Sequence, residues 1–131
     1  MCAAENKDIV LAMYRALNSG DRAGYYARWH DDVEVTYFGS HHLARTYHGK
    51  KDFLDNFVPA LRARLDGTIK LDIHNVVAEG DQVVVEGRGT SQTKDGLPYN
   101  NTYCIVLKLR DGLIVQIREY MDTELTKSIF G

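Results

Sequence analysis

The sequence contains little cysteine, no long apolar run and no basic leader at its start. The two cysteines, Cys2 and Cys104, lie far apart and match neither a redox motif nor a zinc-binding spacing. No apolar stretch is long enough to span a bilayer. The first residues, MCAAENKD, include acidic side chains where a signal peptide would carry basic ones. These absences predict a disulfide-free, cytoplasmic protein without a membrane partner.

An excess of charge of one sign is also absent. The 131 residues include 16 Lys and Arg against 18 Asp and Glu, and the cations are scattered. This balance argues against nucleic acid or an anionic membrane as the main partner. With 44% hydrophobic and 26% charged residues, and no repeat or linker, the composition predicts one globular domain over residues 1–131.

Helical periodicity occupies the first half of the chain. Apolar residues recur at helical spacing over residues 8–17, and the NSG that follows is typical of a helix end. Asp21 is placed to cap a second helix that extends to about Trp29. A third helix is predicted to begin near Lys50. Pro59 lies inside it and is expected to bend it or to remove a hydrogen bond.

Strand patterns dominate the rest of the sequence. VEVTYF alternates as a strand, and the polar GSHHLARTYHG after it is typical of a loop with room for a short strand. From Thr68 the period is two, and the turns EGDQ, KDGLP and RDG separate four strands. Helices followed by an antiparallel meander predict an α+β fold with the helices on one face of the sheet.

The last strand, LIVQIREYMD, carries an unexpected carboxylate. Alternation places Leu113, Val115, Ile117, Glu119 and Met121 on one face, and four of these five are apolar. An unpaired charge there costs several kcal/mol or forces protonation. Glu119 is therefore a candidate for a special role.

Two interpretations of Glu119 stay open. In an apolar pocket a carboxyl pKa rises toward about 6–7, where the group serves as a general acid or base. Alternatively, Glu119 belongs to a buried structural pair with Arg45, Tyr37 or Tyr103. The two tyrosines are also open to two interpretations, as donors to a substrate oxygen or as core aromatics.

The predicted inner face combines apolar residues with a few polar groups, which is typical of a small-molecule site. Gly87 and Gly89 add room because they have no side chain, and Asn101 is either a pocket amide or a turn residue. The predicted catalytic residues are Glu119 and Tyr37. The predicted pocket-lining residues are Met13, Leu17, Trp29, Val35, His48, Phe53, Phe57, Val85, Gly87, Gly89, Asn101, Tyr103, Ile105, Ile117 and Met121.

The histidines of one loop raise the question of a metal. His41, His42 and His48 lie close in sequence, but no HxH or HExxH spacing is present. We therefore expect a solvated loop and no metal, with His48 placed at the pocket rim as a candidate proton carrier. No nucleotide cofactor is expected, because the sequence has neither a P-loop nor a dinucleotide fingerprint.

Several segments resemble the nuclear-transport-factor-2-like superfamily, and most closely its SnoaL-like and ketosteroid-isomerase-like branches. They are LNSGD, HDDVEV, YHGKKDF and DGLIVQIREYMD, and the similarity spans nearly the whole chain. The resemblance implies a cone in which a curved, mostly antiparallel sheet is wrapped by three helices around a deep pocket. It also implies a homodimer formed through the outer face of the sheet.

The residues that match the family motifs narrow the function. Met13, Tyr37 and Ile105 stand where steroid isomerases carry their donor tyrosine, base aspartate and protonated aspartate, so the resemblance does not support that reaction. Glu119 stands where SnoaL-like cyclases carry an acid/base aspartate, whereas Ile105 replaces their histidine. The expected function is a cofactor-independent cyclase, isomerase or dehydratase acting on an apolar or polyketide-like carbonyl compound. The alternative is a non-catalytic ligand-binding or assembly module.

Overall fold

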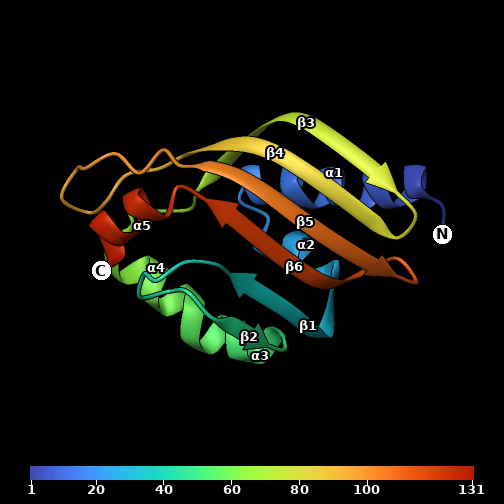
Figure 1. Ribbon diagram of the computed structural model, residues 1–131, viewed down its shortest axis with the longest axis horizontal. Helices are drawn as coiled ribbons and strands as arrows, with labels where there is room; N and C mark the ends of the chain where they lie inside the picture. Colours follow the sequence, from blue (N-terminus) through green and yellow to red (C-terminus); the bar gives the residue numbers. More distant parts are fainter.

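The computed structural model describes residues 1–131 and contains one curved six-stranded sheet with helices packed against it (Figure 1). The third helix is continuous but divided into α3, a π-helical turn η1, and α4. The elements are α1 (Ala3–Asn18), α2 (Arg22–Ala27), β1 (Trp29–Tyr37), β2 (Thr46–His48), α3 (Lys50–Asp52), η1 (Phe53–Phe57), α4 (Val58–Arg64), β3 (Lys70–Glu79), β4 (Gln82–Thr90), β5 (Thr102–Arg110), β6 (Leu113–Met121) and α5 (Thr123–Phe130).

The strands lie in the order β2-β1-β6-β5-β4-β3, and only β1 and β6 run parallel to each other. Short turns join β3 to β4 and β5 to β6, whereas a longer loop over residues 91–101 joins β4 to β5. Helices α1 and α2 lie behind the sheet in Figure 1. The predicted α+β fold with a curved, mostly antiparallel sheet is confirmed. None of the helices combines the length and apolar character that a bilayer crossing requires.

Helix α1 covers part of the inner face and is attached to the sheet at its end. Val10 and Met13 are completely buried in the core. The Asn18 side chain donates a hydrogen bond to the carbonyl of Leu71 at 2.7 Å and accepts one from the Leu71 N–H at 2.8 Å. These two bonds satisfy backbone groups of β3 and hold the end of α1 beside the strand.

The third helix changes its winding immediately before Pro59. The Val58 N–H donates to the carbonyl of Phe53, five residues earlier, which is the hydrogen bond of a π turn. Pro59 has no N–H to continue the regular ladder, and in a regular helix its ring would crowd the carbonyl four residues earlier. The predicted disruption by Pro59 is confirmed. Phe53 and Phe57 stack at 4.7 Å inside the molecule.

Two predicted boundaries and one predicted face are wrong. The second helix ends at Ala27, and Trp29 begins β1 because its backbone pairs with Ile114. In β6 a bulge opposite Lys108–Leu109 shifts the register, so Ile114 points into the core and is completely buried. Leu113 and Val115, predicted to point inward, are only partly buried.

Helix α5 was not expected from the sequence. Asp122 caps it by accepting hydrogen bonds from the Glu124 and Leu125 N–H groups. Asn101 then ties its first turn to the sheet: its Nδ2 donates to the Asp122 carbonyl at 3.1 Å and to Thr126 Oγ1 at 3.0 Å. The helix therefore closes the end of the sheet at which β6 finishes.

Candidate functional site

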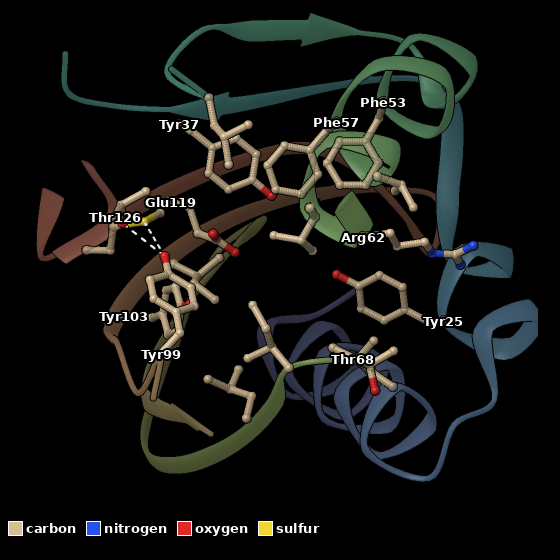
Figure 2. A pocket seen from close by; sticks show the side chains of 18 of the residues that line it. Tyr25, Tyr37, Phe53, Phe57, Arg62, Thr68, Tyr99, Tyr103, Glu119 and Thr126 are labelled. Carbon is tan, nitrogen blue, oxygen red and sulfur yellow. Dashed lines mark hydrogen bonds between the residues drawn. The ribbon is translucent and has the colours of Figure 1, made fainter. Parts of the chain in front are cut away.

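A cavity of about 140 Å³ lies at this end of the inner face, between the sheet, α1 and the helices α2, α4 and α5 (Figure 2). An apolar cavity of about 150 Å³ is large enough to admit benzene, so this one accepts a single ring. Most of its lining is apolar or aromatic. The lining residues are Tyr14, Leu17, Arg22, Tyr25, Tyr26, Tyr37, His41, Leu43, Phe53, Phe57, Val58, Leu61, Arg62, Gly67, Thr68, Ile69, Leu71, Tyr99, Tyr103, Ile105, Glu119, Met121, Thr126 and Phe130.

Glu119 is the only acidic side chain of this lining. It lies on β6 between Tyr37 of β1 and Ile105 of β5, with which it is in register, and its carboxyl group points into the cavity (Figure 2). No hydrogen bond or ion pair to Glu119 is present. Arg45, one predicted partner, pairs instead with Asp52 at 2.7 Å.

Burial alone raises the pKa of Glu119 to about 8. The apolar surroundings disfavour the carboxylate, and no donor or cation compensates for the lost hydration. At pH 7 the protonated acid then exceeds the carboxylate by about ten to one. The group is thus a neutral carboxylic acid that can donate a hydrogen bond or a proton near physiological pH.

Tyrosine hydroxyls surround this carboxyl group. Burial, and to a smaller extent the proximity of Glu119, raises the pKa of Tyr14, Tyr25 and Tyr37 well above the usual value. Burial also raises the pKa of Tyr103, with smaller contributions from Tyr99 and Glu119. All four phenols are therefore neutral at pH 7. The hydroxyls of Tyr14, Tyr25 and Tyr37 have no hydrogen-bond partner in the protein, so they remain free to bond a ligand.

Tyr99, in contrast, belongs to a closed hydrogen-bond network. Its hydroxyl lies 2.9 Å from Thr126 Oγ1 and accepts a hydrogen bond from Asn101 Nδ2 at 3.3 Å. Figure 2 shows this tyrosine beside Thr126 of α5. The Asn101 amide is completely buried and fully occupied with such bonds. It therefore fixes α5 and does not face the cavity.

The structure brings part of the predicted site together. Glu119 and Tyr37 both line the cavity, and Tyr37 stacks on Phe57 with 4.5 Å between ring centroids. The predicted lining residues that also contact the cavity are Leu17, Phe53, Phe57, Tyr103, Ile105 and Met121.

Other predicted lining residues lie in the packed core. Met13, Val35, Val85 and Ile117 have the inward orientation that alternation predicts, but neighbouring side chains cover them completely or almost so. Trp29 is enclosed by aromatic rings, with the Phe53 centroid 4.9 Å away. Inward orientation therefore did not distinguish residues that pack from residues that face a cavity.

Gly87 and Gly89 do not line the cavity, contrary to prediction. A side chain at Gly87 would meet the Asp72 carbonyl at 2.8 Å, and one at Gly89 would meet Tyr103 at 2.7 Å and Ile69 at 2.9 Å. The β3 backbone occupies the space beside Gly87, and the side chains of Tyr103 and Ile69 occupy the space beside Gly89. They allow β3 and the Tyr103 ring to approach closely over β4, which places Tyr103 and Ile69 in the cavity wall.

The histidines are placed differently from prediction. His48 is exposed at the sheet edge, 3.6 Å from Glu34, and does not reach the cavity. His41, expected to be solvated, is only 5% exposed and lines the cavity. Its Nε2 lies 3.1 Å from the Phe38 carbonyl oxygen and so carries the proton, which leaves Nδ1 buried without a partner. No group of three His, Cys, Asp or Glu side chains is arranged to hold a metal ion.

Sequence reasoning missed several lining residues. Tyr14 and Tyr25 lie on helical faces that the periodicity identifies, and helical phase was a usable signal for them. Thr126 and Phe130 belong to the unexpected helix α5. Arg22 and Arg62 are exposed at the cavity mouth and had no signal, because charged helix residues are usually solvated.

Comparison with known proteins identifies the family. The sequence matches the SnoaL-like domain over residues 10–117, and the chain belongs to this family, with a nuclear-transport-factor-2-like fold. A search of curated proteins finds no match.

Solved structures share this fold. Bal32a from a soil-derived mobile gene cassette is 22% identical, with a TM-score of 0.86 and 98% of both chains covered. TerC, co-crystallised with polyporic acid, is 23% identical, with a TM-score of 0.84, 96% of this chain and 98% of the other covered. A putative SnoaL-like polyketide cyclase from Jannaschia sp. CCS1 is 18% identical, with a TM-score of 0.80, 98% of this chain and 93% of the other covered.

Proposed function

We propose that this chain is a cofactor-independent acid/base enzyme that moves a proton on a small apolar molecule bearing a carbonyl group. The observation that carries the proposal is the uncompensated carboxyl group of Glu119 in an apolar cavity. A buried group held against its preferred hydration is more often found at functional sites than elsewhere. Names of structural neighbours support small-molecule chemistry, since one is a putative polyketide cyclase and another was crystallised with polyporic acid.

The proposed roles follow from the positions of the side chains. Glu119 as the neutral acid donates its proton to a substrate carbonyl oxygen. The resulting Glu119 carboxylate takes a proton from the carbon beside that carbonyl, which completes the enol and returns Glu119 to its acid form. Tyr37 and Tyr103 are the proposed hydrogen-bond donors to the same oxygen, because both line the cavity as neutral phenols. Aldol cyclisation, isomerisation and dehydration all fit this proton chemistry.

The alternative is a ligand-binding module that uses the same cavity without catalysis. The two proposals differ in their dependence on pH. Turnover of a carbonyl substrate is expected to follow the titration of Glu119 and to fall at least a hundredfold in Glu119→Gln, which cannot transfer a proton. Retained turnover in Glu119→Gln contradicts the enzyme proposal. Binding without turnover, unchanged between about pH 5 and 8, supports the module.

We also propose a homodimer formed through the outer face of the sheet. Phe38 and Tyr120 stack there at 4.5 Å, and both remain about 40% exposed. Exposed aromatic pairs are typical of interface cores. Light scattering is expected to give twice the chain mass for the wild type and a monomer for Tyr120→Asp. A monomeric wild type at 100 μM contradicts the proposal.

We also propose a cytoplasmic location for this chain. The two cysteines are both free, as is usual for proteins in a reducing compartment.

A further inference from the structure

The charged side chains around the cavity are distributed unevenly. Of the 18 acidic residues in the chain, only Glu119 lines the cavity, at its inner end. Two arginines line it as well, Arg22 from α2 and Arg62 from α4. Both are exposed, so they mark the mouth, and Figure 2 shows Arg62 on the side of Tyr25, across the cavity from Glu119.

Neither guanidinium group is neutralised by the protein. The ion pairs of the chain are made by Arg45, His48, Lys50, Lys51 and Lys108, and none involves Arg22 or Arg62. Nor does either guanidinium donate a hydrogen bond within the protein. Arg22 lowers the pKa of Tyr26 against the larger, opposite effect of burial, which places its positive charge close to a phenol of the lining.

The mouth and the interior therefore favour different parts of a ligand. The interior, with Leu17, Phe57 and Leu61 in its wall, favours an apolar body of about one ring. Two uncompensated guanidinium groups at the entrance favour an anion, and their planar N–H groups match the geometry of a carboxylate. The neutral carboxyl group at the inner end does not repel such an anion.

We propose that the cavity binds a small amphipathic organic acid whose carboxylate lies between Arg22 and Arg62 and whose apolar end extends toward Glu119. This inference rests on the proposed function, because it assumes that the cavity is the ligand site, and it adds the substrate class. The carbonyl on which Glu119 acts then lies at the end of the molecule opposite its carboxylate. The two arginines orient the molecule and do not take part in proton transfer.

A matched pair of probes tests this inference. 3-Phenylpropionate and 3-phenylpropionamide share one ring and one chain length and differ in charge. Isothermal titration calorimetry at pH 6.5 and low salt is expected to show about tenfold tighter binding of the acid. In the double variant Arg22→Gln/Arg62→Gln the preference is expected to fall below twofold with amide binding unchanged. Added 0.5 M NaCl is expected to reduce the preference in the wild type, because salt screens exposed charges.

Arg15→Gln is the control, because Arg15 is an exposed helical arginine that does not line the cavity. Arg15→Gln is expected to retain the full preference for the acid over the amide. The single variants Arg22→Gln and Arg62→Gln are each expected to retain a part of this preference. Equal binding of acid and amide by the wild type, or an undiminished preference in the double variant, overturns the inference and leaves the proposed function standing. Binding of neither probe at millimolar concentration overturns both.

Discussion

The two ends of the sheet's inner face are built from the same strands but enclose different interiors. At one end, Leu107 and Leu109 of β5 face Ile114 and Ile117 of β6, and all are at least 98% buried. At the other end, Tyr103 and Ile105 of β5 meet Glu119 and Met121 of β6 around a cavity.

The covering helices account for this difference. Over the packed end α1 supplies Val10 and Met13, which fill the space above the strands. Over the other end α1 supplies Tyr14 and Leu17, and residues of α4 and α5 complete the cover around the cavity. One sheet face thus provides stability at one end and a candidate site at the other, so substitutions at the two ends are expected to have different consequences.

The largest expected effect is on packing. Leu107→Ala is expected to lower the free energy of unfolding by about 3 kcal/mol, because it leaves a void in a close-packed region. Met121→Ala is expected to cost about 1 kcal/mol, because Met121 already borders empty space and loses fewer contacts. Urea unfolding of both variants measures the difference, and equal losses contradict the proposed division of the face.

The next largest effect is an increase in stability, expected for Glu119→Gln, and its size depends on pH. The pKa of Glu119 is about 8 in the folded protein, against the ordinary value of 4.5 for the unfolded chain. The unfolded chain therefore releases this proton at lower pH than the folded protein does. Wild-type stability is therefore expected to fall as the pH rises from about 4.5 to about 8. Glu119→Gln removes this loss, so the variant is expected to be about 2–3 kcal/mol more stable at pH 7 and nearly equal at pH 4.5.

Urea unfolding at pH 4.5, 7 and 8.5 tests this expectation. A difference that does not change with pH contradicts the raised pKa. A strong destabilisation in Glu119→Gln at every pH indicates instead that Glu119 is one half of a structural pair.

A smaller effect is expected in the wall of the cavity end. Gly89→Ala places a methyl group 2.7 Å from the Tyr103 ring and 2.9 Å from Ile69, so one of them must move. The expected cost is about 1–2 kcal/mol. Thr90→Ala, on the outward side of the same strand, is the control and is expected to change stability by less than about 0.5 kcal/mol. If Gly89→Ala leaves the free energy of unfolding unchanged, the side chains of the cavity wall can rearrange at little cost, contrary to this expectation.

The smallest effect separates two tyrosine hydroxyls of the same cavity. Tyr99→Phe removes the bond to Thr126 and is expected to cost about 1 kcal/mol. Tyr37→Phe removes a hydroxyl that has no protein partner, so its cost in stability is expected to be below about 0.3 kcal/mol. Equal losses in thermal or urea unfolding contradict the assignment of Tyr99 to structure and Tyr37 to ligand binding.

Much of the fold could be predicted because periodicity reports the environment of each residue along one element. Strand alternation placed Glu119 on the inner face. The missing N–H of Pro59 predicted a bend or a lost hydrogen bond in the third helix, but not that the irregularity would be a π turn. The bulge in β6 could not be predicted, because it depends on the partner strand. Helix α5 had a weak signal in the cap Asp122, but eight residues are too few for a clear helical period.

The site was harder to predict than the fold. Alternation gave Met13 and Val85 the correct orientation, but it cannot report how far the opposite helix lies from the strand. The effect of Gly89 depends on Tyr103 and Ile69, which belong to other strands. His41 lies in a loop with no period at all, so only its tertiary surroundings reveal that it is buried.

The number of residues in the π turn at Phe53–Phe57 determines which side chains of α4 face the cavity mouth. Each residue of a helix turns the chain by about 100° and advances it by about 1.5 Å. Deleting one residue such as Leu54 from the turn would rotate α4 relative to α3 by about that angle, which would withdraw Leu61 and Arg62 from the cavity and present their neighbours. In this architecture, ligand selectivity can therefore change through a single-residue insertion or deletion, without any substitution.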